Sequence, residues 1–297
     1  MKLIIQPEDG PEPVLAAIDG AKKSLDIVVF RLDIKEIVAA LHRAVGRGVA
    51  VRAQIAHTNK GGEKALRKLE CRLLDAGATV SRSPDILVRY HGKMMIVDGR
   101  TLHVNGFNLT WADLSHSRSF AAVMTSAPLV KEALRLFEAD LGRQPYTNAN
   151  ARLVVSPETS RAALGAFIAG ARKQLLIYDP NISDKRMLRL LEERAKAGVD
   201  VRILGKRSRR GLNLHKFPGK RLHVRAILRD GRRAFIGSQS LRALELDDRR
   251  EIGVMIDEAA AVKKLVTVFE ADWALTVAPE PVAEVSERAA SPENDVV

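Results

Sequence analysis

Cysteine is almost absent from this chain. Cys71 is the only one among 297 residues, which excludes a disulfide within the chain and a cysteine-rich metal site. Long apolar runs are also missing, since none approaches the roughly 20 residues of a membrane span. The opening "MKLIIQPEDG" has too short an apolar run for a signal-peptide core. We therefore expect a cytoplasmic protein in a reducing compartment, one that would meet a membrane only from its aqueous side.

Aromatic residues are scarce and positive charge is abundant. Only 4% of the residues are aromatic, whereas proteins that bind single-stranded nucleic acid usually stack bases on several aromatic rings. The formal net charge is +12 and the isoelectric point is near 10.0. This charge favours polyanionic partners: nucleic acid, anionic lipid head groups or phosphorylated substrates. The low aromatic content tilts the balance towards lipid.

The chain repeats itself. Pro7 matches Pro157, and Arg52 matches Arg202, at an offset of 150 residues. Later the offset becomes 132, where "FEADL" from Phe137 matches "FEADW" from Phe269. Several pairs at a common offset indicate an internal duplication. We assign residues 1–145 and 146–277 to two similar lobes, and residues 278–297, rich in Pro, Ala, Ser and acid, to a disordered tail.

Strands and helices alternate in each half. In the first, the pattern predicts strands at 3–5, 25–30 and 49–55, and helices at 11–23, 33–46 and 61–76. In the second, it predicts strands at 152–155, 175–178 and 199–204, helices at 158–172 and 184–197, and a basic loop at 205–221. This alternation is typical of α/β architecture. We expect two α/β/α sandwich lobes that face each other across a pseudo-two-fold axis.

One unusual strand pattern occurs in both halves: "HGKMMIVD" at 91–98 and "HVRAILRD" at 223–230. Because strand side chains alternate, a histidine and a cation two residues apart would point the same way. Two such pairs meeting at the axis suit a phosphodiester. The cations would stabilise the phosphate oxygens, while one histidine attacks phosphorus and the other moves a proton. This chemistry requires no metal and no cofactor.

These two motifs resemble those of the phospholipase D superfamily, His-x-Lys-x4-Asp followed by Gly-Ser-x-Asn. The resemblance covers about residues 3 to 275. It implies a phosphohistidine intermediate on one histidine, a general acid at the other, and a phosphate-binding Asn. It also implies a Glu, 28 residues after each histidine, that orients the imidazole.

The first motif supplies His91 as nucleophile, with Lys93, Asp98 and Asn108 in their usual places. Ser119 stands where the Glu that orients His91 belongs. Asp98 and its counterpart Asp230 are expected to bond backbone or buried polar groups near the strand ends.

The second motif supplies His223 as general acid, and Glu251 as the carboxylate that orients it. Arg225 replaces the usual Lys, and Ser240 replaces the Asn as phosphate ligand. Each half thus lacks something that the other keeps, and reduced activity is one outcome of that divergence.

The expected function is a phosphodiesterase or phosphatidyltransferase of phospholipase D type, which acts on a phospholipid at the membrane surface. The loop at 205–221 would capture the anionic substrate. Two alternatives stay open: a nuclease with the same chemistry, and a degenerate, non-catalytic member that binds phosphate-bearing ligands. The head group, the accepting water or alcohol, and the oligomeric state are not specified by the sequence.

Overall fold

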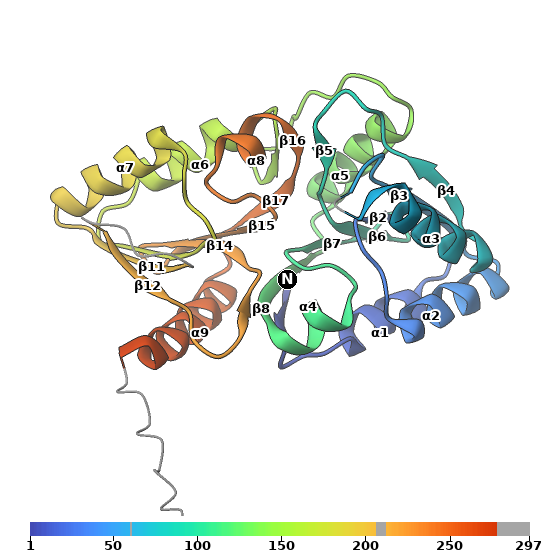
Figure 1. The fold of residues 1–297 in the computed structure, drawn as a ribbon, viewed down its shortest axis with the longest axis horizontal. Coiled ribbons are helices and arrows are strands. Elements are labelled where there is room, and N and C mark those ends of the chain that lie inside the picture. Colours follow the sequence, from blue (N-terminus) through green and yellow to red (C-terminus); the bar gives the residue numbers. More distant parts are fainter. Residues whose placement is uncertain (60, 206–211, 278–297) are drawn as a thin grey trace, which may run out of the picture.

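The computed structural model describes residues 1–59, 61–205 and 212–277, which form two α/β lobes lying side by side (Figure 1). The predicted tail and residues 206–211 of the basic loop lie outside the described residues. No helix in the described ranges has both the length and the apolar character needed to cross a lipid bilayer.

Each lobe contains one sheet, and the two sheets have the same strand order. The first is β1-β8-β7-β6-β2-β3-β4: β1 (Lys2–Gln6), β8 (Ser117–Met124), β7 (Thr101–Asn105), β6 (Met94–Val97), β2 (Ser24–Val29), β3 (Ala50–Ile55) and β4 (Thr79–Arg82). The second is β9-β17-β15-β14-β10-β11-β12: β9 (Leu153–Val155), β17 (Ile252–Ile256), β15 (Arg233–Gly237), β14 (Arg225–Arg229), β10 (Gln174–Tyr178), β11 (Asp200–Gly205) and β12 (Asn213–Lys216). The identical orders confirm the duplication and the two-lobed α/β fold.

Helices cover both faces of each sheet. The outer face of the first sheet packs against α1 (Glu12–Gly20), α2 (Lys35–Gly46) and α3 (Gly62–Asp75), and that of the second against α6 (Ser160–Ala169) and α7 (Lys185–Lys196). The inner faces share one apolar core with α5 (Ala127–Leu141) and α9 (Ala259–Val277). Burial on both faces explains the nearly continuous apolar run of β2, "SLDIVV". Two short helices, α4 (Trp111–His116) and α8 (Ala243–Asp247), occupy equivalent places in the two lobes.

Two expectations about local structure are wrong. The basic loop includes β12, which pairs in parallel with β11. His91 and Lys93 lie outside β6, which begins at Met94, because the segment before it crosses to the other lobe. There β5 (Arg89–Tyr90) pairs with β16 (Arg249–Arg250). The equivalent segment β13 (Arg221–Leu222) pairs with β8 of the first lobe.

The prediction for Asp98 and Asp230 is confirmed. Each has a positive φ, 54° and 55°, at the turn after its strand. Asp98 accepts the backbone N–H groups of residues 22–24, and Asp230 accepts those of residues 172–174. Because these turns follow the C-terminal ends of β6 and β14, whereas the histidines precede the strands, both aspartates brace the sheets and lie away from the site.

Two buried ion pairs join the lobes, and the duplication makes them equivalent. Arg118 on β8 donates to Asp272 on α9 at 2.8 and 2.9 Å. Arg250 on β16 donates to Asp140 on α5 at 2.9 Å. Each arginine also binds a glutamate of its own lobe, Glu8 or Glu158. Arg118 and Arg250 therefore fix the relative position of the lobes.

We predict that Arg118→Met destabilises the chain by about 3 to 5 kcal/mol, because it leaves the buried Asp272 carboxylate without its cation. The double variant Arg118→Met, Asp272→Asn should recover part of that loss. The control, Arg43→Met, removes the exposed pair with Asp19 and should change stability far less. Urea unfolding measures all three. An equal effect of Arg118→Met and Arg43→Met would contradict the role given to the cross-lobe pair.

Candidate active site

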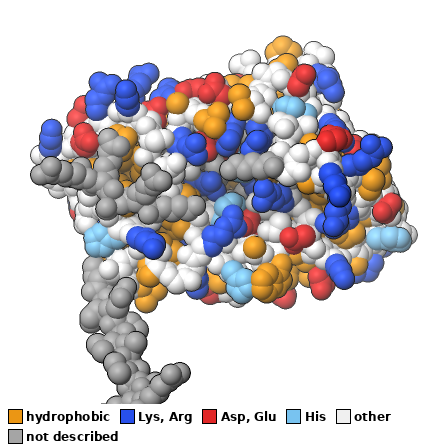
Figure 2. All heavy atoms as spheres, viewed as in Figure 1, with side chains coloured by type: hydrophobic (Ala, Val, Ile, Leu, Met, Phe, Trp, Pro, Cys, Tyr) orange, Lys and Arg blue, Asp and Glu red, His pale blue; other side chains and the backbone are white. Residues whose placement is uncertain are grey.

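A cleft of about 680 Å³ lies between the lobes, and both motif histidines line it. Figure 2 shows Lys, Arg and His side chains gathered at the centre of the face between the two halves. The cleft is strongly basic, since six arginines line it: Arg31, Arg89, Arg221, Arg225, Arg242 and Arg249. Within the described part of the chain, Glu245 is its one acidic lining residue. The structure therefore brings the two motifs together in one cationic site.

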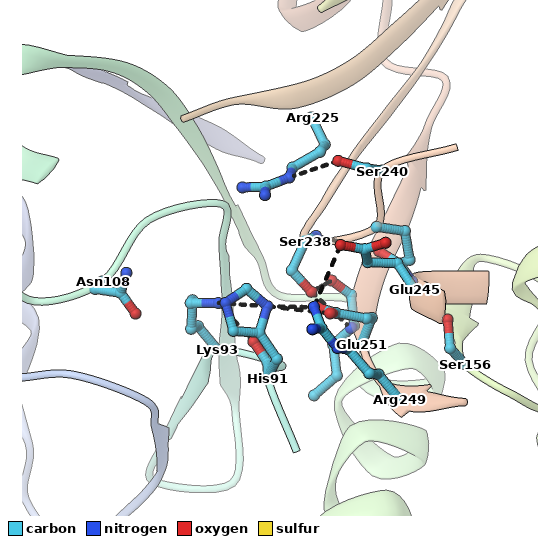
Figure 3. Close-up of polar contacts among 12 residues, drawn as sticks. His91, Lys93, Asn108, Ser156, Arg225, Ser238, Ser240, Glu245, Arg249 and Glu251 are labelled. Atoms are coloured by element: carbon cyan, nitrogen blue, oxygen red, sulfur yellow. Dashed lines mark hydrogen bonds and ion pairs between the residues drawn. The ribbon is translucent and has the colours of Figure 1, made fainter. Parts of the chain in front are cut away.

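Glu251 contacts His91, not His223. Its carboxylate oxygens lie 2.9 and 3.1 Å from His91 Nδ1 (Figure 3). The expectation that Glu251 orients His223 is therefore wrong. The reason is the strand crossing. The backbone N–H of His91 donates to Arg250 O at 2.8 Å, and this pairing places Glu251, the residue after Arg250, beside the His91 imidazole. With Nδ1–H donated to Glu251, Nε2 keeps its lone pair facing away from the carboxylate.

Lys93 lies against the same imidazole. Its Nζ lies 3.0 Å from Nε2 and 3.1 Å from Nδ1 of His91, and it donates to His91 O at 2.5 Å. Burial, chiefly, lowers the pKa of Lys93 to about 7, and the nearby Arg225 adds to the effect. Burial followed by the charges of Lys93 and Arg225 lowers the pKa of His91 well below its usual value. His91 is therefore neutral at pH 7, as a nucleophile must be.

His223 has different neighbours. Its backbone N–H donates to Arg118 O at 3.2 Å. The residue after Arg118 is Ser119, so a serine takes the position beside His223 that Glu251 takes beside His91. The Ser119 hydroxyl is fully buried and has no hydrogen-bond partner among the described residues, and the expectation that it accompanies His91 is wrong. Asp113 Oδ2 lies 3.3 Å from His223 Nδ1, near enough for an ion pair but poorly aligned for a hydrogen bond. Burial and the charge of Arg225 lower the pKa of His223.

Arg225 and Ser240 belong together. Arg225 Nε donates to Ser240 Oγ at 3.2 Å, and its Nη1 donates to His223 O at 3.1 Å, as Lys93 does to His91 O. Both residues line the cleft, and Arg225 Nη2 makes no hydrogen bond to a described residue. Arg225 thus takes the structural place of a lysine with a differently shaped cation.

Asn108 also lines the cleft. One of its side-chain N–H groups donates to Asp113 Oδ2 at 2.8 Å, and its backbone N–H donates to the same oxygen. The second side-chain N–H stays available to a phosphate oxygen.

Sequence reasoning missed Asp113 and most of the arginines. Asp113 and Glu245 are separated by 132 residues, so the offset that matched the histidines also pairs these two acids. The same offset relates Arg89 to Arg221. Both signals were present in the sequence, but neither falls inside the motifs. Within the described ranges, no group of three or more His, Cys, Asp or Glu side chains is arranged to hold a metal ion.

A family model described as "Cardiolipin synthase, PLD-like domain" matches residues 14–141 and 164–273, which include both motifs. The chain belongs to the phospholipase D-like family. Crystal structures with the same fold include phosphatidylserine synthase of Haemophilus influenzae Rd KW20, at 11% identity and a TM-score of 0.71. That match covers 93% of this chain and 86% of the synthase.

Polyphosphate kinase of Porphyromonas gingivalis also has this fold, at 17% identity and a TM-score of 0.75. The match covers 91% of this chain, which spans only 46% of the kinase. No curated protein matches the chain. The phospholipase D-like chain thus shares its two-lobed fold with phosphoryl-transfer proteins, while its substrate is not specified by these likenesses.

We predict that kcat/KM for a phosphodiester falls as the pH rises through about 7, because Lys93, with a pKa of about 7, then loses its positive charge. Lys93→Arg should move this limb to higher pH, since guanidinium stays protonated, although kcat should drop because the larger group fits the site less well. The kcat/KM profile of each protein measures the effect. If kcat/KM of the Lys93→Arg variant falls at the same pH as that of the unmodified chain, the titrating group is not Lys93.

Proposed function

We propose that this chain transfers or hydrolyses a phosphodiester through a covalent phosphohistidine on His91. The observation that carries the proposal is the His91–Glu251 contact at 2.9 Å, inside a basic cleft that His223 also lines. Glu251 holds the proton on Nδ1, so Nε2 is the attacking atom. When substrate enters, a phosphate oxygen would accept from Lys93 and draw its ammonium group away from the imidazole.

In the first step, Nε2 of His91 forms a bond to phosphorus as the bond to the leaving oxygen breaks. Protonated His223 donates its proton to that oxygen. Burial and the charge of Arg225 lower its pKa, and a negatively charged phosphate beside the ring would raise it. In the second step, His223 takes a proton from water or an alcohol, whose oxygen attacks phosphorus and displaces His91. Lys93, Arg225 and Asn108 would stabilise the oxygens of both transition states.

The substrate class that we propose is a phospholipid. The family description names a lipid enzyme, and apolar side chains are exposed beside the cleft: Ile86 at 72%, Val88 at 57% and Trp111 at 61%. Each is within three residues of a cleft-lining residue, Arg89 or Asn108. Exposed tryptophan and aliphatic groups next to cations suit the interface of an anionic membrane.

A nuclease is the second candidate. Six arginines line the cleft, and few of its lining side chains are apolar, namely Phe30, Pro180 and Leu222. Such a surface suits a strand of phosphates. The residues that favour lipid therefore lie outside the cleft, while those that favour nucleic acid lie inside it.

A panel of anionic vesicles and single- and double-stranded DNA, assayed in EDTA, distinguishes the two. We expect release of head group from vesicles and no cleavage of DNA. Trp111→Ser should lower the rate on vesicles at least about fivefold by weakening interfacial binding. Leu74→Ser, which changes an exposed residue of α3, is the control. DNA cleavage with inert vesicles would replace the lipid proposal by the nuclease.

The intermediate can be trapped directly. With a p-nitrophenyl phosphodiester, which has a good leaving group, we predict that His223→Ala accumulates acid-labile phosphate on His91, because attack no longer needs the general acid. His91→Ala should carry no label. Mass spectrometry of both variants measures it. Label on His223 in the His91→Ala protein would reverse the roles of the two histidines.

A further inference from the structure

Among the described residues, the positive charges of the cleft are unevenly divided between its two histidines. The duplication pairs every position beside His91 with one beside His223. For instance, the Asp33 N–H donates to Leu109 O, and the Ser183 N–H donates equivalently to Leu241 O. Four positions on the His91 side hold arginine: Arg31, Arg89, Arg242 and Arg249. The equivalent positions on the His223 side hold, in the same order, Asn181, Arg221, Thr110 and Ser117.

Contacts place these arginines on the His91 side. The Phe30 ring packs edge-on against the His91 ring at 4.5 Å. The guanidinium groups of Arg31 and Arg89 lie 5.7 and 6.0 Å from the centre of the same Phe30 ring. Arg249 is the strand partner of Arg89. Phe30 is therefore surrounded by cations next to the attacking imidazole, while the equivalent residue beside His223 is Pro180.

Carboxylates do not neutralise all of these charges. Glu245 is shared between Arg242, at 3.3 Å, and Arg249, at 3.2 Å. Arg221, the counterpart of Arg89, is paired with Asp113. Arg31 and Arg89 have no carboxylate partner among the described residues, and the buried Arg89 Nε has no hydrogen-bond acceptor there. Arg31 is exposed, but Arg89 is half-buried, and a half-buried guanidinium without a partner is unfavourable unless a ligand supplies the anion.

The reacting phosphate does not account for this surplus. A phosphodiester carries one negative charge, and Lys93 and Arg225 already supply two cations at the paired motif positions. We propose that Arg31, Arg89 and Arg249 form a second anion subsite, which binds a further phosphate of the substrate close to the one that is attacked. This inference rests on the proposed function. It narrows the substrate to a diester that bears another phosphate nearby, because planar guanidinium groups bind phosphate through two parallel hydrogen bonds.

Inorganic phosphate and pyrophosphate, titrated calorimetrically into the full chain at matched ionic strength, test the subsite. Pyrophosphate should bind at least about tenfold more tightly than phosphate, since a charge-assisted hydrogen bond is worth more than the 1.4 kcal/mol of a tenfold change. Arg89→Gln should reduce this ratio to below about threefold. Arg31→Gln, at an exposed position where a substitution should disturb folding little, should reduce it too.

Two variants serve as controls. Arg225→Gln should weaken both ligands by a similar factor and keep the ratio, because it acts at the first phosphate. Arg221→Gln, which removes the counterpart of Arg89 across the pseudo-two-fold axis, should also keep the ratio, because Asp113 already neutralises that arginine. A ratio near one in the unmodified chain would overturn the subsite, and so would equal losses of ratio in the Arg89 and Arg221 variants.

These outcomes are separate from those that test the phosphohistidine. A preference for pyrophosphate without any trapped phosphoenzyme would leave the subsite standing and remove the catalytic proposal. Trapped phosphoenzyme without a preference for pyrophosphate would support the catalytic proposal and remove the subsite.

Discussion

The site depends on one contact, the hydrogen bond between His91 of the first lobe and Glu251 of the second. It forms only because β5 leaves its own lobe to pair with β16. This pairing places the His91 backbone against Arg250 and the His91 imidazole against Glu251. The buried pairs of Arg118 with Asp272 and of Arg250 with Asp140 hold the lobes in the position that this contact needs. Neither lobe alone contains an oriented imidazole, so the lobes must be docked before the proposed chemistry can begin.

The two halves have diverged around a shared frame. The identical strand orders and the matching Asp98 and Asp230 turns keep both motifs in equivalent places. The side chains around the histidines have not stayed equivalent: His91 keeps a carboxylate in hydrogen-bond contact, while His223 has the short Ser119 and a poorly aligned Asp113. A fixed tautomer suits a nucleophile, whereas a less constrained imidazole suits a group that must gain and lose a proton. Divergence is therefore consistent with a division of roles as well as with loss of activity.

Much of the fold followed from sequence because the duplication supplied each element twice. The strand at 25–30 and the helix at 33–46 agree with β2 and α2, and both have counterparts 150 residues later. The error over Glu251 and Ser119 has a physical cause: an offset relates residues within a lobe, while the site is assembled by exchange of short strands between lobes. Strand β12 was missed because it is a strand only through its pairing with β11, and the basic composition of the 205–221 segment gives no sign of that pairing. The four arginines on the His91 side of the cleft, Arg31, Arg89, Arg242 and Arg249, were missed because three of them have no arginine at the equivalent position of the other half.

The protonation state of His91 decides whether its Nε2 can attack phosphorus. In protein labelled with ¹⁵N at histidine, long-range ¹H–¹⁵N spectra at pH 7 report which ring nitrogen carries the proton. We expect a neutral imidazole with its proton on Nδ1, held by Glu251, and loss of that preference in Glu251→Ala. A proton on Nε2, or an imidazolium at pH 7, would contradict it, because the proposed attacking atom would then have no lone pair to use.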